Sequence, residues 1–165
     1  MPCVFLGLGS NIGNKEKNLQ TAIALIADIP DCKIIAISPC YETSPVGGYP
    51  QDDFLNQVIE VTTALSPLKL LEHLVEIEQL FGRTHSERNA PRRLDIDVLL
   101  FDNAIIHNDT LTIPHPRMHE RLFVLIPLAD IAADVIHPIV NKTICNIRDD
   151  VIKKVGELQR IKLKS

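Results

Sequence analysis

The chain has 165 residues, of which 45% are hydrophobic and 23% are charged. These ordinary values exclude a disordered or membrane protein and favour one soluble domain, while a net charge of -4 at pH 7 argues against a nucleic-acid-binding protein, which needs a basic surface. The four cysteines form no C-x-x-C pair, so we expect reduced thiols in a cytoplasmic protein rather than disulfides or zinc ligands.

Hydrophobic periodicity and turn residues divide the chain into strands and helices. The predicted strands cover residues 4–8, 33–41, 54–63 and 94–101. Two helices have clear start signals, because Asn14 and Ser66 are side chains of the type that caps a helix. Gly82 closes the second of these helices, and two more helices are predicted at residues 120–129 and 142–155.

The order of these elements is β-α-β-β-α-β, followed by further helices. This order is typical of an α+β, ferredoxin-like fold, in which helices pack on both sides of a mainly antiparallel sheet. With no repeat or linker in view, we expect one domain over residues 1–165, with a loose basic tail at residues 156–165.

Two aspartates alternate with apolar residues in the predicted strand at 94–101. Alternate side chains of a strand share a face, so Asp95 and Asp97 point the same way, with Cα atoms about 6.6 Å apart, while Leu94, Ile96 and Val98 face the core. Magnesium prefers one or two carboxylates together with phosphate oxygens and water. The pair therefore indicates a metal site, although a solvent-exposed strand face would also accommodate two aspartates.

A basic loop precedes these aspartates and carries Arg83, Arg88, Arg92 and Arg93. Guanidinium groups bind phosphate oxygens in a fork and stay charged. Arginines for phosphate beside carboxylates for metal are typical of phosphoryl transfer, in which positioning and charge neutralisation provide most of the catalysis. The alternative is a structural network in which the same arginines pair with the aspartates.

Two further residues have less specific signals. His115 lies between two prolines that fix its backbone, close to Arg117 and Arg121, and can bind phosphate there. A lone histidine is more often structural, so it is supporting evidence only. Glu78 lies on the helix that ends at Gly82 and either orients an arginine or is a solvated edge residue.

Several segments in register resemble the family of 6-hydroxymethyl-7,8-dihydropterin pyrophosphokinase, a folate-pathway enzyme. The most specific is Ala-Pro-Arg-Arg-Leu-Asp-Ile-Asp-Val-Leu at residues 90–99. The resemblance covers residues 4 to about 140. Its other segments are Leu-Gly-Ser-Asn at 8–11, Tyr-Glu-Thr-Ser-Pro at 41–45, Phe-Leu-Asn at 54–56, Ile77-Glu78 with Gly82-Arg83, and Thr-Ile-Pro-His at 112–115.

The resemblance implies a reaction in which the pterin hydroxymethyl oxygen attacks the β-phosphorus of MgATP, pyrophosphate is transferred and AMP leaves. It implies that Asp95 and Asp97 hold two magnesium ions and, with Arg83 and Arg92, form the catalytic set. The residues that it assigns to ATP are Glu78, Arg83, Arg88, Arg92, Val98, Thr112, His115 and Arg121. Those that it assigns to the pterin are Thr43, Pro45, Val46, Phe54, Asn56, Asp95 and Phe123, with Phe54 and Phe123 on the two faces of the ring.

The chain departs from the family pattern at three positions. Asn89 stands where the family often has a tryptophan, His85 where a second loop arginine is common, and Pro116 where a tyrosine commonly follows the histidine. These departures concern how the loop closes rather than the reaction. Two alternatives stay open: another magnesium-dependent nucleotidyltransferase, or a non-catalytic ferredoxin-like ligand-binding module. In each case we expect a monomer.

Overall fold

The computed structural model describes residues 1–44, 53–82, 93–155 and 161–163. The main sheet contains β1 (Cys3–Ser10), β2 (Cys32–Ile37), β3 (Tyr41–Thr43), β4 (Phe54–Thr63), β5 (Asp95–Phe101) and β8 (Ile161–Leu163). The helices are α1 (Lys15–Ala27), α2 (Pro67–Leu80), α3 (Leu122–Ala132) and α4 (Ile144–Val155), with a short 3-10 helix η1 (Met118–Glu120). A separate hairpin is formed by β6 (Ile106–His107) and β7 (Thr112–Ile113).

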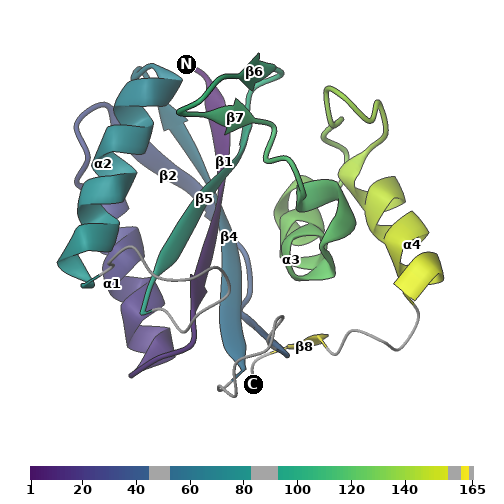
Figure 1. Cartoon of the computed structure of the whole chain (residues 1–165), viewed down its shortest axis with the longest axis horizontal. Coiled ribbons are helices and arrows are strands. Elements are labelled where there is room, and N and C mark those ends of the chain that lie inside the picture. The colour runs from purple at the N-terminus through teal and green to yellow at the C-terminus, as the bar shows by residue number, and fades with distance from the viewer. Residues whose placement is uncertain (45–52, 83–92, 156–160, 164–165) are drawn as a thin grey trace.

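The main sheet runs in the order β5-β1-β4-β3-β8, and β2 also pairs with β4. All strand pairs of the described residues are antiparallel, and β2 and β3 occupy successive stretches of the same edge of β4. Figure 1 shows α1 and α2 on one side of this sheet and α3 and α4 on the other. The expectation of an α+β protein with a mainly antiparallel sheet and helices on both sides is confirmed.

The helix start signals act as the sequence predicts. The Asn14 side chain accepts a hydrogen bond from the backbone N–H of Lys17, and the Ser66 side chain accepts one from that of Lys69. Just past the end of α2, Gly82 has a φ of +77°, a conformation that glycine adopts without strain.

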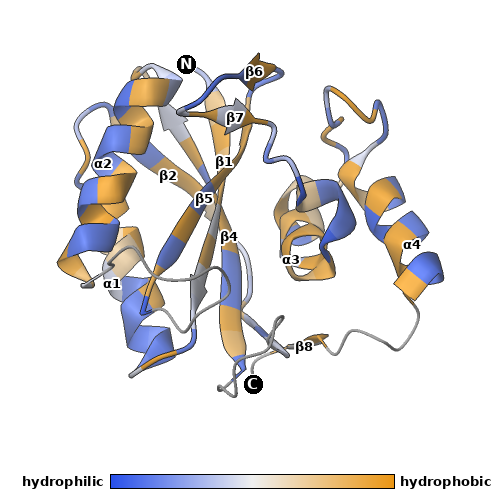
Figure 2. Cartoon of the chain, viewed as in Figure 1, coloured by the Kyte–Doolittle hydropathy of each residue, from blue (hydrophilic) through white to orange (hydrophobic). Residues whose placement is uncertain are grey.

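Two hydrophobic clusters lie on opposite faces of the sheet, because the strands alternate their side chains. Val4, Leu6 and Leu8 of β1 pack in the first cluster, which α1 and α2 cover. Phe5 of the same strand packs in the second cluster, which includes residues of α3 and α4. In Figure 2, β5 and α3 are mainly hydrophobic, whereas hydrophilic residues recur along α1, α2 and α4.

Three features differ from the sequence expectation. The predicted strand at 33–41 is interrupted, with β2 ending at Ile37 and β3 beginning at Tyr41. The β6–β7 hairpin was not predicted. Residues Ile161–Leu163 are not loose, because they form β8 and pair with β3 in the register Thr43↔Ile161. Within the described residues, no helix is both long and apolar enough to cross a membrane.

Candidate active site

Asp95 and Asp97 lie on one face of β5, as predicted. Ile96 and Val98 are buried in the first cluster, and the two aspartates are half-buried on the opposite face. In the register of β5 and β1, Asp95 lies opposite Gly9 and Asp97 opposite Gly7. Directly opposed residues of antiparallel strands share a face, so the sheet beside each carboxylate carries no side chain.

The row that begins at Asp95 continues across four strands. Gly9 of β1 lies opposite Asn56 of β4, and Asn56 lies opposite Tyr41 of β3. A Cβ atom at Gly9 would lie 3.1 Å from Oδ1 of Asn56, which is closer than side chains normally approach. Glycine at this position therefore leaves room for the amide of Asn56 beside the carboxylate.

A buried hydrogen bond fixes the orientation of this amide. Nδ2 of Asn56 donates to Oγ1 of Thr43 over 2.7 Å. Thr43 lies opposite Phe54 in the β3–β4 ladder, so Phe54 shares the face of Asn56 and is half-buried at the start of β4. The face thus carries carboxylates on β5 and an amide with a neighbouring aromatic ring on β4.

His115 joins the same face from the segment after β7. Its backbone N–H donates to the carbonyl of Leu99 on β5, and its Nδ1 accepts from the backbone N–H of Arg117 over 3.1 Å. The neutral ring therefore carries its proton on Nε2, which lies 3.9 Å from Oδ2 of Asp97.

The charge state of His115 follows from its surroundings. Burial, and after it the positive charge of Arg121, lowers the pKa of His115 to about 4, and Asp95 only partly opposes them. At neutral pH the ring is uncharged, so its contact with Asp97 is not an ion pair. His115 is therefore an N–H donor facing the carboxylates.

Arg121 and Phe123 meet at the start of α3. The guanidinium carbon of Arg121 lies over the ring of Phe123, 5.4 Å from its centroid, within the range of a cation–π contact. The resemblance assigns the arginine to phosphate and the aromatic ring to the pterin. Their contact places these two predicted residues next to each other, and Arg121 lies near enough to His115 to affect its pKa.

Glu78 is not a solvated edge residue. It is only 5% exposed on α2, and its Oε2 accepts a hydrogen bond from the backbone N–H of Ile96 over 2.9 Å. Ile96 lies between Asp95 and Asp97, so this buried carboxylate anchors the strand that presents them. No signal in the sequence identified a backbone amide as the partner of Glu78.

The two remaining described residues assigned to ATP lie elsewhere. The side chain of Val98 packs in the first cluster, on the face of β5 opposite to that of Asp95 and Asp97. Thr112 belongs to β7, where its Oγ1 lies 3.5 Å from Nδ1 of His107. The structure therefore does not bring the Val98 side chain to the carboxylate face.

Several predicted residues lie outside the described residues, namely Pro45, Val46, Arg83, Arg88 and Arg92, as do His85 and Asn89. Their assignments stay predictions.

The donor set fits magnesium better than a metal held entirely by protein. Among the described residues no group of three or more His, Cys, Asp or Glu side chains could hold a metal ion. Two carboxylates on one open face, with oxygen ligands still to be supplied by phosphate and water, match the way that magnesium is bound in phosphate-transfer sites.

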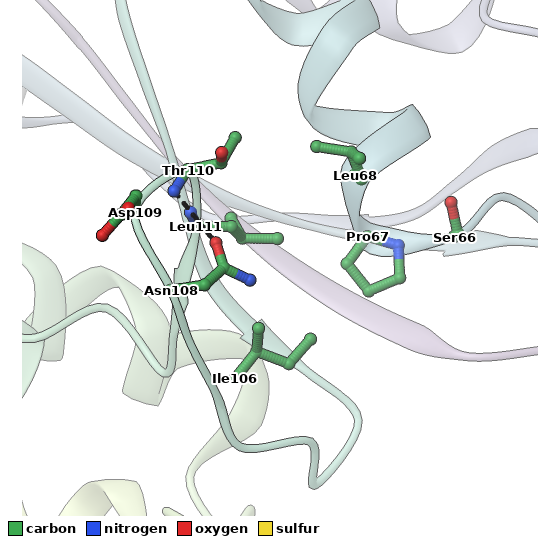
Figure 3. A pocket seen from close by; sticks show the side chains of 8 residues that line it. All are labelled: Ser66, Pro67, Leu68, Ile106, Asn108, Asp109, Thr110 and Leu111. Atoms are coloured by element: carbon green, nitrogen blue, oxygen red, sulfur yellow. Dashed lines mark hydrogen bonds between the residues drawn. The ribbon is translucent and has the colours of Figure 1, made fainter.

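A hollow of about 480 Å³ lies at the other end of the sheet, between the start of α2 and the β6–β7 hairpin. Figure 3 shows the side chains that line it, and none of them is a predicted site residue: Ser66, Pro67, Leu68, Ile106, Asn108, Asp109, Thr110 and Leu111. The hollow is therefore separate from the carboxylate face.

Comparisons with known proteins show which family the chain resembles. A family model described as 7,8-dihydro-6-hydroxymethylpterin-pyrophosphokinase (HPPK) matches residues 5–133. A 2-amino-4-hydroxy-6-hydroxymethyldihydropteridine pyrophosphokinase of Bacillus subtilis is 46% identical over 131 residues, which are 79% of this chain and 78% of the relative. A protein of the same name from Haemophilus influenzae is 38% identical over 163 residues, which are 99% of both chains.

Solved structures show the same fold. An HPPK-DHPS crystal structure in complex with substrates has a TM-score of 0.73 and 19% identity, and covers 94% of this chain. The wild-type HPPK-DHPS of Plasmodium falciparum has a TM-score of 0.75 and 17% identity, and covers 95% of this chain. The chain spans 44% and 46% of those longer proteins, respectively.

Proposed function

The chain belongs to the 7,8-dihydro-6-hydroxymethylpterin-pyrophosphokinase family, and on this premise we propose that it makes the pyrophosphorylated pterin of folate biosynthesis. It transfers pyrophosphate from MgATP to the hydroxymethyl group of 6-hydroxymethyl-7,8-dihydropterin and releases AMP. The observation that supports this proposal is the row Asp95–Gly9–Asn56, in which a carboxylate and a side-chain amide lie on one face of the sheet on either side of a glycine.

The phosphate half of the site lies at the β5 end of this row. Asp95 and Asp97 hold two magnesium ions, which neutralise charge on the triphosphate when they are bound. His115 donates from Nε2 to a phosphate oxygen, because its Nδ1 is occupied by the backbone N–H of Arg117. Arg121 supplies positive charge beside it, and we assign Arg83, Arg88 and Arg92 to the same task.

Glu78, Val98 and Thr112 complete the proposed ATP contacts. The side chains of Glu78 and Val98 are buried. We therefore propose that these residues hold the backbone at the edge of β5 in position, and that their side chains do not contact phosphate directly. This position would bring the nucleoside part of ATP along the edge of the sheet.

The acceptor half of the site lies at the β4 end of the row. The hydrogen bond to Thr43 uses one N–H of the Asn56 amide, which leaves its second N–H and the capacity of Oδ1 to read the edge of a pterin ring. Phe54 and Phe123 offer aromatic faces to a flat, neutral heterocycle. Backbone groups around Thr43, Pro45 and Val46 read the remaining ring edge.

The chemistry then depends on alignment more than on a strong general base. The hydroxymethyl oxygen forms its bond to the β-phosphorus as the bond from that phosphorus to the AMP oxygen breaks. Holding both reactants on one rigid sheet face removes much of the entropic cost of this step. Carboxylate, histidine and arginine groups that are already in place stabilise the transferred charge.

The deciding experiment is AMP release from MgATP in the presence and absence of 6-hydroxymethyl-7,8-dihydropterin. We expect AMP to form only when the pterin is present. A nucleotidyltransferase would instead release pyrophosphate, so product analysis separates that alternative. A non-catalytic module would bind without magnesium, which calorimetry with a non-hydrolysable ATP analogue and the pterin would detect.

We further propose that the fold is ferredoxin-like and that the chain is a single domain over residues 1–165 acting as a cytoplasmic monomer. The strand order β5-β1-β4 with β2 and β3 on the outer edge, and α1 and α2 in the two crossovers, supports the fold assignment. Free cysteines in the described residues support a reducing compartment. Sedimentation analysis tests the monomer, and a dimer at assay concentration would contradict it.

A further inference from the structure

A side-chain hydrogen bond joins the sheet to α3 beside the proposed acceptor site. The hydroxyl of Tyr41, on β3, donates to Oδ2 of Asp130, on α3, over 2.5 Å. Neither residue has a role in the function proposed above, and they lie 89 positions apart in the sequence.

On the sheet side, Tyr41 belongs to the row that carries the acceptor amide. It lies opposite Asn56, while Thr43, two residues further along β3, accepts the hydrogen bond from Asn56. Because β3 is only three residues long, a shift of Tyr41 also shifts Thr43. The hydroxyl of Tyr41 is therefore coupled to the amide that reads the pterin.

On the helix side, Asp130 follows Phe123 by two helical turns, so the two residues lie on the same side of α3. The helix packs across β4 and β3. Pro127 lies inside α3 and lacks an N–H, so it gives no helical hydrogen bond to the carbonyl of Phe123. The first turn of α3 thus depends more than usual on contacts outside the helix.

Resting on the function proposed above, we propose that Tyr41 and Asp130 are positioning residues for the acceptor. Their hydrogen bond sets the separation between the β3–β4 surface, with Asn56 and Phe54, and the turn of α3 that bears Phe123. That separation defines the slot for a flat ring. Burial, and after it the hydrogen bond to Asp130, raises the pKa of Tyr41 to about 12, so the hydroxyl remains a donor throughout the assay range.

The test begins with Tyr41→Phe, which removes the hydroxyl and keeps the ring. We expect the KM for the pterin to rise about five- to tenfold, the size of effect that loss of one typical hydrogen bond gives. The KM for MgATP is expected to change much less, because Asp95, Asp97 and His115 lie on β5 and the segment after β7, although Arg121 caps α3. A merely structural role would move both KM values and the melting temperature together.

Matched variants at Asp130 sharpen the test. Asp130→Asn keeps an acceptor for the tyrosine hydroxyl and retains most of the wild-type KM for the pterin, whereas Asp130→Ala matches Tyr41→Phe. The double variant Tyr41→Phe/Asp130→Ala is no worse than either single variant, because both remove the same interaction. Asp134→Asn, a charge change at an exposed residue just past α3, is the control and leaves both KM values unchanged.

A second measurement does not depend on activity. Hydrogen exchange of the free protein is expected to be faster in the first turn of α3 in Tyr41→Phe than in the wild type, with no change in α2. Wild-type exchange in α3 together with a wild-type KM for the pterin would overturn the positioning role while the proposed function stands. A wild-type protein that releases no pterin-dependent AMP would overturn the proposed function, and this inference with it.

Discussion

Asp97 is the residue on which the proposed chemistry depends most directly. Its side chain is 38% exposed and packs in neither hydrophobic cluster, so Asp97→Ala removes the proposed metal ligand without opening the core. We expect turnover to fall by about 10³-fold or more, a loss typical of removing a group that stabilises the transferred charge. Steady-state AMP release measures it, and unchanged thermal unfolding shows that the fold is intact.

Asp109, an exposed acid in the β6–β7 hairpin, provides the control. Asp109→Ala should retain wild-type turnover. Near-normal activity in Asp97→Ala would contradict the metal assignment.

Replacing Glu78 is expected to lower both the free energy of unfolding and the turnover rate. Glu78→Ala leaves the backbone N–H of Ile96 without its acceptor in a buried place, which costs about 1–3 kcal/mol of the free energy of unfolding. The turnover rate also falls, because the strand between the two aspartates loses its anchor. Glu78→Gln keeps a side-chain acceptor and is expected to recover most of the stability. Urea denaturation of the three proteins checks this, and equal midpoints would show that the hydrogen bond contributes nothing.

The alternation of Asp95 and Asp97 with apolar neighbours correctly predicted that the two carboxylates share one face of β5. The partners of Glu78 and Tyr41 could not be predicted in this way, because they lie 18 and 89 residues away in the sequence. No local pattern specifies such contacts. The seven-residue spacing of Phe123 and Asp130 is visible in the sequence and puts both residues on one side of a helix. The sequence does not show that this side of the helix meets the sheet.

At the scale of elements, strand β1 places two glycines differently beside the site. A Cβ atom at Gly9 would lie 3.1 Å from Oδ1 of Asn56, whereas one at Gly7 would lie 3.4 Å from the flexible side chain of Leu99. Gly9→Ala should therefore displace the amide and raise the KM for the pterin several-fold, by roughly the effect of one perturbed hydrogen bond.

Gly7→Ala is the matched control, since Leu99 can shift by a few tenths of an ångström. The KM for the pterin is measured for both variants with the same preparation of the pterin. Equal KM values for the two variants would show that the amide tolerates the added methyl group.

The long elements were predictable and the short ones were not. The helices α1 and α2 carry cap residues, and β4 and β5 carry continuous apolar patterns, so local chemistry defines them. The strands β6, β7 and β8 have two or three residues each, too few to show a period. Their pairing partners, rather than their own sequences, make them strands.

At the scale of the whole molecule, two buried histidines predict how stability depends on pH. Burial lowers the pKa of His115 to about 4 and also lowers that of His137, which accepts two backbone hydrogen bonds at Nδ1. Both bind protons more readily when unfolded, where their pKa is about 6.5. The free energy of unfolding therefore decreases as pH falls from about 6.5 toward 4, and is unaffected by these groups above that range.

His137→Asn tests this dependence, because its side-chain oxygen can accept in place of Nδ1 but does not titrate. Chemical denaturation between pH 4 and 8 should show a shallower loss of stability in the variant than in the wild type. Parallel curves for the two proteins would contradict the contribution of His137.

The order of elements and the antiparallel sheet were predictable from the whole sequence, because helices and strands alternate in a way that few topologies satisfy. The positions of the helices that follow these elements were not predictable. Helices α3 and α4 follow the last of the four predicted strands, and only tertiary packing decides that they cover the Phe5 face.

The pairing of β8 with β3 also has a consequence for how the chain is made. During synthesis β3 emerges early, but its outer partner emerges only after α3 and α4 have been translated. Until then, β3 exposes a row of unpaired backbone groups, the kind of edge that recruits other chains. The outer edge of β3 is thus the last part of the main sheet to find its partner as the chain is made.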